Sequence, residues 1–267
     1  MSERGSMEQS FSGRVALVTG GSSGIGRGAA LELARLGARV AVLSFDADRN
    51  TETVAEIEAA GGAALPIAAD VTRPDELADA VALIDREWGR LDHVVISAGK
   101  NGVFAPLDQL TLAEWNDTLA TNLTSTFLTT QAALPLLRRA GGSIVIISSV
   151  NGNRTFRFPG AVAYSTSKAG QVTFAKMVAV ELAQYGIRIN VVCPGAVRTN
   201  IGEATHPRDL ERITWPVEFP RGAYPLGGRQ AEPTQIARVI TFLLSDAADY
   251  VTGTEVYADA ATSLIHG

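Results

Sequence analysis

The chain has 267 residues, 46% of them hydrophobic, and its 28 acidic and 23 basic residues give a net charge of −5. This length suits one large domain with a full core better than two domains. The basic residues are scattered, which argues against nucleic acid or an anionic membrane as a partner. Cys193 is the single cysteine, so no intrachain disulfide can form, and the three histidines lack metal-ligand spacing, so no metal site is expected.

The first ten residues, MSERGSMEQS, have no apolar core, and we expect them to form a disordered tail ahead of one domain at residues 11–267. No later run reaches the roughly 18 apolar residues that a membrane span requires. These features predict a cytoplasmic protein that does not enter a membrane.

Short β-branched runs alternate with longer helical patterns along the rest of the chain. Seven runs predict strands: RVALVTG, RVAVLSF, AALPIAAD, LDHVVISAG, GSIVIISS, IRINVVCPG and GTEVYAD. Helical patterns lie near 24–36, 50–60, 74–88, 111–138, 163–185 and 233–245. Strands that are apolar on both faces and separated by helices indicate a parallel sheet covered on each side. With right-handed crossovers, this is a single doubly wound α/β domain of the Rossmann type.

Residues 199–228 form the one long segment without a regular pattern, and it contains four prolines. A loop of this length in a compact domain is more often a lid over a substrate site than an accident. Trp215 in this lid is a candidate substrate contact, and packing of the lid onto the body is an equal alternative for it.

A glycine-rich loop follows the first expected strand in the sequence TGGSSGIGRGAALELARLG. Glycines allow a tight turn and close approach to a pyrophosphate, whose charge is met by free N–H groups at the start of the next helix. A strand before and a helix after are the context that a dinucleotide site requires, so a turn without a ligand is the weaker alternative. The loop residues expected to bind the dinucleotide are Gly20, Ser22, Ser23, Gly24, Ile25 and Gly26.

The end of the second strand bears on the choice between NAD and NADP. An acidic residue roughly 20 positions beyond the glycines would bind the adenosine ribose and favour NAD. Ser44 lies about there, with Asp46 two residues later and Arg49 beyond it. Asp46 favours NAD slightly, while Arg49 and the neutral Ser44 leave NADP open.

Asp70, followed by Val71, ends the third strand in AADVT. A carboxylate there can accept a hydrogen bond from the adenine amino group. A helix N-cap or turn-forming role is equally compatible with the sequence, and Asp70 could do both.

Tyr164 and Lys168 lie four residues apart in AYSTSKAGQVTFAKMVAVELA, so both project from one helical face. A tyrosine pKa of about 10 must fall by roughly 3 units, or about 4 kcal/mol, for acid/base work at neutral pH. A buried ammonium one turn away and an oxidised nicotinamide could supply that stabilisation of the phenolate. The pair is a weak signal alone and a strong one beside a glycine loop and a serine at a strand end.

The motifs TGGSSGIG, SAG at 97–99, TNLTSTF, IISSV, YSTSK and NVVCPGAVRT occur in an order and spacing that resemble the short-chain dehydrogenase/reductase family over nearly the whole chain. The resemblance implies that Tyr164 is the general acid/base and that Lys168 tunes it and binds the nicotinamide ribose. It implies that Ser149 hydrogen-bonds the substrate oxygen and that Asn122 holds a water linking Lys168 to solvent.

The same resemblance implies further contacts and an assembly. Close to the nicotinamide and its ribose it places Ala98, Gly99, Pro194, Gly195, Val197 and Thr199. It also implies a homotetramer, with a dimer as the alternative.

Three positions depart from the family pattern. Ile96 and Ser97 replace a pair of asparagines, which alters a side-chain hydrogen bond in the central sheet. Ala260 and Ala261 replace two glycines after Asp259, and an alanine at positive φ would cost about a kcal/mol. Ser44 replaces the acidic residue that selects the coenzyme.

The segment NGNRTFRFPG joins Ser149 to Tyr164 and therefore borders the expected substrate pocket. Guanidinium groups at a pocket rim suit carboxylate, phosphate or sulfonate recognition. Asn151, Arg154 and Arg157 are therefore candidate substrate contacts, with solvated surface charge as an equal alternative for the arginines.

These features predict an NAD- or NADP-dependent oxidoreductase acting on a secondary alcohol or its ketone, with a sugar, polyol or anionic polar substrate. An alternative is a 3-oxoacyl-thioester reductase of the acyl carrier type, which the net acidity of the chain opposes. A non-catalytic dinucleotide sensor is a third reading, disfavoured because Tyr164 and Lys168 are both present.

Overall fold

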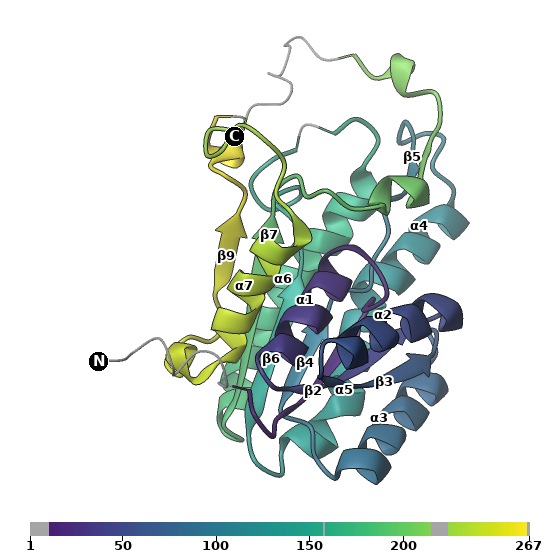
Figure 1. The fold of residues 1–267 in the computed structure, drawn as a ribbon. Coiled ribbons are helices and arrows are strands. Elements are labelled where there is room, and N and C mark those ends of the chain that lie inside the picture. Colours follow the sequence, from purple (N-terminus) through teal and green to yellow (C-terminus); the bar gives the residue numbers. More distant parts are fainter. Residues whose placement is uncertain (1–10, 157, 215–223, 266–267) are drawn as a thin grey trace.

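The structure is a computed structural model that describes residues 11–156, 158–214 and 224–265. The expected tail at 1–10 lies outside the described residues, as do Arg157 and Trp215. The central element is a seven-stranded sheet whose paired strands all run parallel (Figure 1). In spatial order its strands are β3 (Ala63–Ala68), β2 (Arg39–Ser44), β1 (Val15–Thr19), β4 (His93–Ile96), β6 (Gly142–Ile147), β7 (Ile187–Pro194) and β9 (Glu255–Ala258). The seven predicted strands and their parallel arrangement are confirmed.

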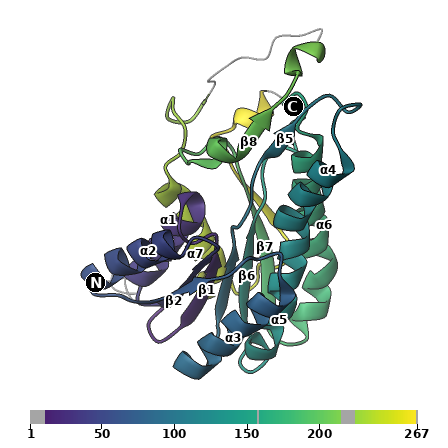
Figure 2. The ribbon, with the colours of Figure 1, turned by 90° about the vertical axis from the view of Figure 1, so that its right-hand side faces the viewer.

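Helices cover both faces of this sheet, as Figure 2 shows. One face carries α1 (Gly24–Arg35), α2 (Ala47–Ala59) and α7 (Pro233–Leu244); the other carries α3 (Pro74–Trp88), α4 (Leu112–Leu119), α5 (Ser125–Leu137) and α6 (Val162–Ala183). The short 3₁₀ helices are η3 (Ile201–Ala204), η4 (Leu210–Arg212), η5 (Asp246–Ala248) and η6 (Thr262–Leu264). The expected doubly wound α/β domain of Rossmann type is therefore what the chain forms. Within the described residues, no helix is both long and apolar enough to cross a membrane.

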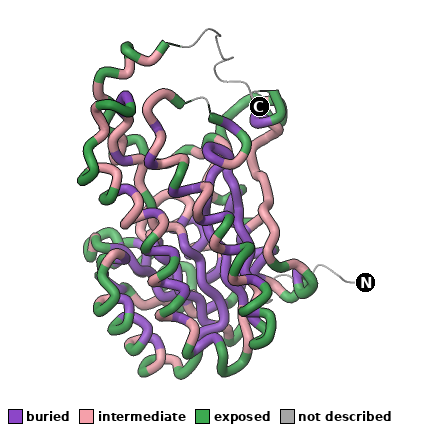
Figure 3. The backbone as a smooth tube through the Cα atoms, turned by 180° about the vertical axis from the view of Figure 1, so that it is seen from behind, coloured by how far each residue is buried: buried purple, intermediate pink, exposed green. Residues whose placement is uncertain are grey.

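Burial follows from the alternation of side chains along each strand. On β1, Val15 and Leu17 pack into the core beneath α3, α5 and α6, while Ala16 and Val18 pack into the core beneath α1 and α7. Figure 3 shows the buried strands between more exposed helices. The sheet is therefore buried on both faces. Successive strands are added on one side of β1 up to β3 and on the other side from β4 onward. Doubly wound folds form a binding crevice at such a switch point, here between β1 and β4.

Two features of the fold were not predicted. β5 (Gly102–Phe104) and β8 (Thr205–Pro207) pair in parallel as a separate two-stranded sheet, with Gly102 opposite Thr205. The predicted helix at 111–138 is instead α4 and α5 joined by a π-helical turn at Ala120–Thr124. Both features lie beside the site described below.

The described part of residues 199–228 is more ordered than the sequence indicated, because it contains η3, β8 and η4. Arg208 fastens it to the body: its guanidinium lies 2.7 and 3.0 Å from the two carboxylate oxygens of Glu114 on α4, and it donates to Gln109 O at 2.6 Å. Arg212 pairs with Asp108 at 3.2 Å. This segment is thus held across the loop that follows β5.

Ala260 and Ala261 both adopt positive φ, at 54° and 63°, where glycine is the residue of low cost. The turn is held by Asp259, whose carboxylate accepts the N–H groups of Ala261 at 3.1 Å and Ser263 at 2.8 Å. The condition under which alanine would be strained is therefore met at both positions.

Replacing both alanines with glycine is expected to raise the free energy of unfolding by about 1 kcal/mol, because the relief of left-handed strain exceeds the added entropy of the unfolded chain. Chemical denaturation measures the change. Ala55, exposed in the middle of α2, is the matched control, and Ala55→Gly should lower the free energy of unfolding by about 1 kcal/mol. Equal destabilisation by both changes would contradict the argument from strain.

Candidate active site

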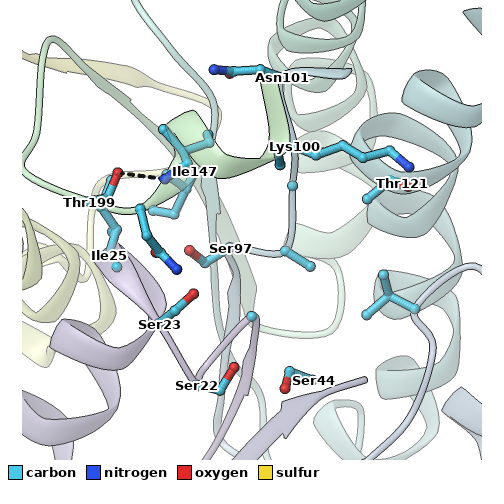
Figure 4. Close-up of a pocket in the computed structure, with 18 of the residues that line it drawn as sticks. Ser22, Ser23, Ile25, Ser44, Ser97, Lys100, Asn101, Thr121, Ile147 and Thr199 are labelled. Carbon is cyan, nitrogen blue, oxygen red and sulfur yellow. Dashed lines mark hydrogen bonds between the residues drawn. The ribbon is translucent and has the colours of Figure 1, made fainter. Parts of the chain in front are cut away.

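A cavity of about 850 Å³ opens at the carboxyl ends of the central strands. Residues from β2, β6 and β7 and from the loops after β1, β3 and β4 line it. Figure 4 shows Ser22, Ser23 and Ser44 at one end of the view and Lys100 and Asn101 at the other. The cavity therefore spans the distance from the glycine loop to the segment after β4.

The glycine loop forms one wall of this cavity. Gly20 has a φ of 64°, and a Cβ on it would lie 2.9 Å from the Ala98 backbone; Gly24 has a φ of 50°, and a Cβ there would lie 3.2 Å from the Thr199 methyl group. The helix that follows, α1, begins without a side-chain cap and without an acidic residue in its first turn. Its free N–H groups and positive end fit a pyrophosphate, so the residues present fit a dinucleotide.

The end of β2 offers the ribose pocket neither a free carboxylate nor a dedicated cation. Ser44 lines the cavity, and its hydroxyl donates to Asn50 Oδ1 at 2.7 Å. Asp46 caps α2 by accepting the Arg49 N–H at 3.0 Å, and its carboxylate lies 3.4 Å from the Arg49 guanidinium. Arg49 lines the cavity, whereas Asp46 is absent from the described lining.

Asp70 and Val71 lie at the end of the cavity lined by Ser44. Asp70 forms a turn rather than the cap of α3, because its Oδ1 accepts the N–H and the hydroxyl of Thr72, each at 2.8 Å, and Arg73 is the N-cap residue. Of its two sequence-based structural roles, the turn is observed and the N-cap is not.

Asn122 lies in the π-helical turn between α4 and α5 and is fully buried. Its Nδ2 donates to Lys100 O at 2.9 Å and to Ser167 Oγ at 3.0 Å, and its Oδ1 accepts the Lys100 N–H at 2.9 Å. Single π-helical turns inside α-helices are frequent at functional sites. A Cβ on Gly99 would lie 3.3 Å from Asn122 Oδ1 and 3.5 Å from Lys168 Nζ, so this glycine lets the two side chains approach the strand end.

Ser149 and Tyr164 both line the cavity, and their side chains are hydrogen-bonded to each other. The Ser149 oxygen accepts the Asn151 N–H at 3.0 Å, which leaves its O–H free to donate. Burial raises the pKa of Tyr164, and the hydrogen bond with Ser149 lowers it by less. The expected fall of this pKa is therefore not produced by the chain alone.

Lys168 is buried one turn after Tyr164 on α6. Its Nζ donates to Ile147 O at 2.9 Å and to Gln171 Oε1 at 3.2 Å, and it lies 5.7 Å from the centroid of the Tyr164 ring. Burial lowers the pKa of Lys168 from its usual 10.5 to about 8. At neutral pH the side chain is still an ammonium group, which favours a phenolate beside it.

The far wall is built from the residues after β7. Gly195 donates its N–H to Ala258 O at 3.1 Å, and Val197 forms an isolated bridge with Ala231. Pro194, Gly195, Val197 and Thr199 all line the cavity, as do Ala98 and Gly99 opposite them. The structure thus brings together the residues that the sequence assigned to a nicotinamide site.

The candidate substrate residues are not all in one place. Asn151 is buried, and its Nδ2 donates to Ser165 Oγ at 3.1 Å. Arg154 is exposed and stacks on Tyr257, with its guanidinium carbon 3.5 Å from the ring centroid. Neither residue belongs to the described lining of the cavity, so a direct role in substrate binding stays a prediction for both.

Sequence reasoning missed several side chains of the site. Asn101, Asn200 and Glu203 line the cavity. Lys100 lines it too and pairs with Asp117 at 2.6 Å. Gln171 lies behind Lys168. The sequence does place Gln171 one helical turn after Lys168 on the buried side of α6, but its partners come from another helix and are not evident from the sequence.

No group of three or more potential ligands for a metal ion occurs among the described residues. His93 is buried in the core, where its ring contacts the Phe11 ring edge at a centroid distance of 5.0 Å and its Nδ1 lies 2.8 Å from Ser143 Oγ. Burial lowers the pKa of His93 to about 3, so it is a neutral core residue.

A glycine cradle at a helix N-terminus shares one cavity with Ser149, Tyr164 and Lys168, and the buried Asn122 hydrogen-bonds the backbone of Lys100 in the same lining. This combination defines the class of nicotinamide-dependent oxidoreductases. The family profile described as "Enoyl-(Acyl carrier protein) reductase" matches residues 20–262. This chain belongs to the short-chain dehydrogenase/reductase family, and it is accordingly an NAD(P)-dependent oxidoreductase acting on CH–OH groups.

Individual relatives cover almost the whole chain. A 2,5-dichloro-2,5-cyclohexadiene-1,4-diol dehydrogenase of Sphingobium indicum is 34% identical over 97% of this chain and 99% of its own. A D-threitol dehydrogenase of Mycolicibacterium smegmatis is 35% identical over 94% of each chain. The structure of a 3-ketoacyl-ACP reductase from Sinorhizobium meliloti is 43% identical, with a TM-score of 0.88 over 94% of this chain and 99% of its own.

Proposed function

We propose that this enzyme oxidises a secondary alcohol of a small diol or polyol, and reduces the matching ketone, with Tyr164, Lys168, Ser149 and Asn122 as its catalytic group. The observation that carries the proposal is that Ser149, Tyr164 and Lys168 line one dinucleotide-sized cavity. Asn122 hydrogen-bonds the backbone of Lys100, which lines the same cavity. The bound coenzyme supplies the hydride acceptor or donor at the nicotinamide ring.

Each of these four residues then has a defined role in the oxidation. Ser149, oriented by the Asn151 N–H, donates its hydroxyl hydrogen to the substrate oxygen. Tyr164 takes the hydroxyl proton as general base. Lys168 stabilises the phenolate through its charge. Asn122 holds the segment after β4 in place through its two hydrogen bonds to the Lys100 backbone.

Polar groups at the nicotinamide end of the cavity support a polyhydroxy substrate. Asn101, Asn200 and Glu203 line this part and can exchange hydrogen bonds with hydroxyl groups. Two relatives, a cyclohexadienediol dehydrogenase and a threitol dehydrogenase, are named for diol or polyol substrates. The notion of a lid at 199–228 includes residues 215–223, which lie outside the described structure; we propose in addition that its described beginning, from Thr199 to Ala204, covers this end of the cavity.

A 3-oxoacyl thioester is the second candidate, supported by the 43% identical reductase structure. A carrier phosphate would be helped by free positive charge at the mouth of the site. In the described part of the chain, Lys100, Arg208 and Arg212 are each paired with a carboxylate, on Asp117, Glu114 and Asp108 respectively. This pairing favours the polyol over the thioester.

A panel of diols, polyols, sugars and 3-oxoacyl thioesters, each offered with NAD and NADP or their reduced forms, tests the proposal through nicotinamide absorbance. We expect turnover with several diols or polyols and little with thioesters. Preferential turnover of the thioesters would replace the first candidate with the second, and dinucleotide binding without turnover of any substrate would favour a sensor.

We infer that both coenzymes are accepted, with kcat/KM values within about tenfold of each other, or about 1.4 kcal/mol. Ser44 supplies no carboxylate for the ribose, and Asp46 and Arg49 offset each other's charge. The sequence favoured NAD slightly through Asp46, and the capping role of this residue weakens that preference.

Ser44→Asp is expected to raise the NAD/NADP ratio of kcat/KM by about tenfold or more, because a carboxylate there accepts ribose hydroxyl hydrogens and repels a 2′-phosphate. Steady-state kinetics with both coenzymes measure the ratio. Ser44→Asn also loses the serine hydroxyl but adds no charge, so its ratio should stay near the wild-type value. An unchanged ratio in Ser44→Asp would place the ribose away from β2.

We also propose a homotetramer, with a dimer as the alternative. Two separate sets of large apolar side chains are exposed: Phe127, Met177 and Val180 on α5 and α6, and Phe242 and Tyr250 on and after α7. Two apolar faces on different sides of the sheet are what two distinct two-fold interfaces require.

A further inference from the structure

Gln171 is a fully buried glutamine on α6, three residues after Lys168. Its Oε1 accepts the Lys168 Nζ–H at 3.2 Å. Its Nε2 donates to Asn122 O at 2.8 Å and to Thr126 Oγ1 at 2.9 Å. One uncharged side chain thus connects the catalytic lysine with the backbone of the catalytic asparagine.

The backbone oxygen of Asn122 accepts hydrogen bonds from two side chains. It accepts the Thr126 hydroxyl at 2.9 Å and the Gln171 amide at 2.8 Å. A carbonyl oxygen has two lone pairs. The family resemblance assigned to Asn122 a water that links Lys168 to solvent, and Gln171 adds a direct protein contact between Lys168 and the Asn122 backbone.

A role for Gln171 in core packing alone does not account for these hydrogen bonds. Its neighbours Val172 and Ala175 belong to the apolar core beneath α6, and burying an amide there is costly unless its polar atoms are hydrogen-bonded. The oxygen and both amide hydrogens have partners, and the partners are parts of the catalytic group or of the π-helical turn that carries it. A satisfied buried network of this kind fixes one geometry.

We propose that Gln171 is a positioning residue that holds the Lys168 ammonium beneath Tyr164 by bracing it against Asn122 and Thr126. This inference rests on the proposed function of the four catalytic side chains. Gln171 touches neither substrate nor coenzyme and acts only through Lys168.

Few titratable groups act on the Lys168 ammonium besides its contact with Gln171. In the described part of the chain, the titratable groups that act on Lys168 are Tyr164 on its own helix and Cys193 on β7. Burial raises the pKa of Cys193 to about 12, so its thiol is neutral. The hydrogen bonds to Ile147 O and Gln171 Oε1 are therefore the contacts that stabilise the charged form of Lys168.

The decisive variant is Gln171→Met, which keeps the length of the side chain and removes its hydrogen bonds. The charged lysine loses an acceptor, so the alkaline limb of the kcat/KM profile should move down by about one pH unit. The ammonium is also less well held below Tyr164, so the acid limb of alcohol oxidation should move up. The coenzyme KM should change little, because Gln171 does not line the cavity.

A matched pair on α5 keeps the test decisive if Gln171→Met does not fold. Thr126 and Thr130 are both buried and each donates to the carbonyl four residues earlier, at 2.9 and 2.8 Å, but only Thr126 accepts from Gln171. Thr126→Val should narrow the pH profile, and Thr130→Val should leave it unchanged. A folded Gln171→Met with the wild-type profile, or identical profiles for the two valine variants, would overturn the proposal.

Failure of the proposed function is distinguished by a second readout. The ionisation of Lys168 is measured without any substrate, as the pH dependence of the difference in unfolding free energy between a protein and its Lys168→Met counterpart. In the Gln171→Met background Lys168 should lose its proton at lower pH than in the wild type, because the ammonium has lost an acceptor. A wild type without turnover but with this shift would reject the proposed function alone, and turnover without either shift would reject the role of Gln171 alone.

Discussion

Tyr164→Phe is expected to lower kcat by about 10³-fold, within the range that positioned acid/base groups contribute. The change removes only the phenol oxygen, which exchanges the proton with the substrate. The ring stays, together with its contact with Phe104 at a centroid distance of 6.4 Å. Dinucleotide affinity, measured by quenching of protein fluorescence, should therefore remain close to that of the wild type.

Tyr185→Phe is the matched control for this change. Tyr185 lies beyond the end of α6, where its ring stacks under the Arg138 guanidinium at 4.2 Å from the centroid, and it is absent from the described cavity lining. It should retain wild-type kcat. Unchanged turnover in Tyr164→Phe would reject the mechanism, and equal loss in both variants would indicate damage to the fold rather than to proton transfer.

Much of the fold could be predicted because its strands and helices carry strong local patterns. β1 and β4 are continuous apolar runs, and α1 follows a glycine loop, so their places were evident from the sequence. β5 and β8 were missed because each has three residues and its partner lies about a hundred positions away. The π-helical turn was missed because helical periodicity does not distinguish it from an α-helix.

The site, like the fold, could be predicted only in part. The glycine loop and the Tyr164–Lys168 pair have fixed spacings, and the cavity does bring them together. Asp46 was expected to bear on the ribose, yet an aspartate directly before a helix is also an N-cap signal, and the cap is what forms. Gln171 could not be assigned because its partners Asn122 and Thr126 come from another helix, and only tertiary packing places them together.

Arg154 shows the limit of reasoning from loop position. The loop between Ser149 and Tyr164 joins two residues that line the cavity, but Arg154 on this loop stacks on Tyr257, which belongs to β9. The sheet order that puts β9 beside β7 was not fixed by the sequence. A guanidinium–aromatic contact of this kind can therefore be recognised only when the positions of the strands in the sheet are known.

Lys168→Met should lower kcat/KM by about 10² or more, since the phenolate loses its cationic neighbour. The same change should alter the pH dependence of stability in a defined direction. Burial holds the pKa of Lys168 at about 8 in the folded chain, against 10.5 when exposed. Between these values the unfolded chain binds more protons, so wild-type stability rises with pH across this window.

Below pH 8 the buried ammonium thus opposes folding, by about 3 kcal/mol for a shift of this size, and the opposition fades towards pH 10.5. Lys168→Met has no such group. Its stability relative to the wild type should therefore fall by about 3 kcal/mol between pH 7 and pH 10.5, as measured by urea unfolding at several pH values. A constant difference would mean that Lys168 is hydrated in the folded protein, and the ammonium could not then act on Tyr164 through a low-dielectric interior.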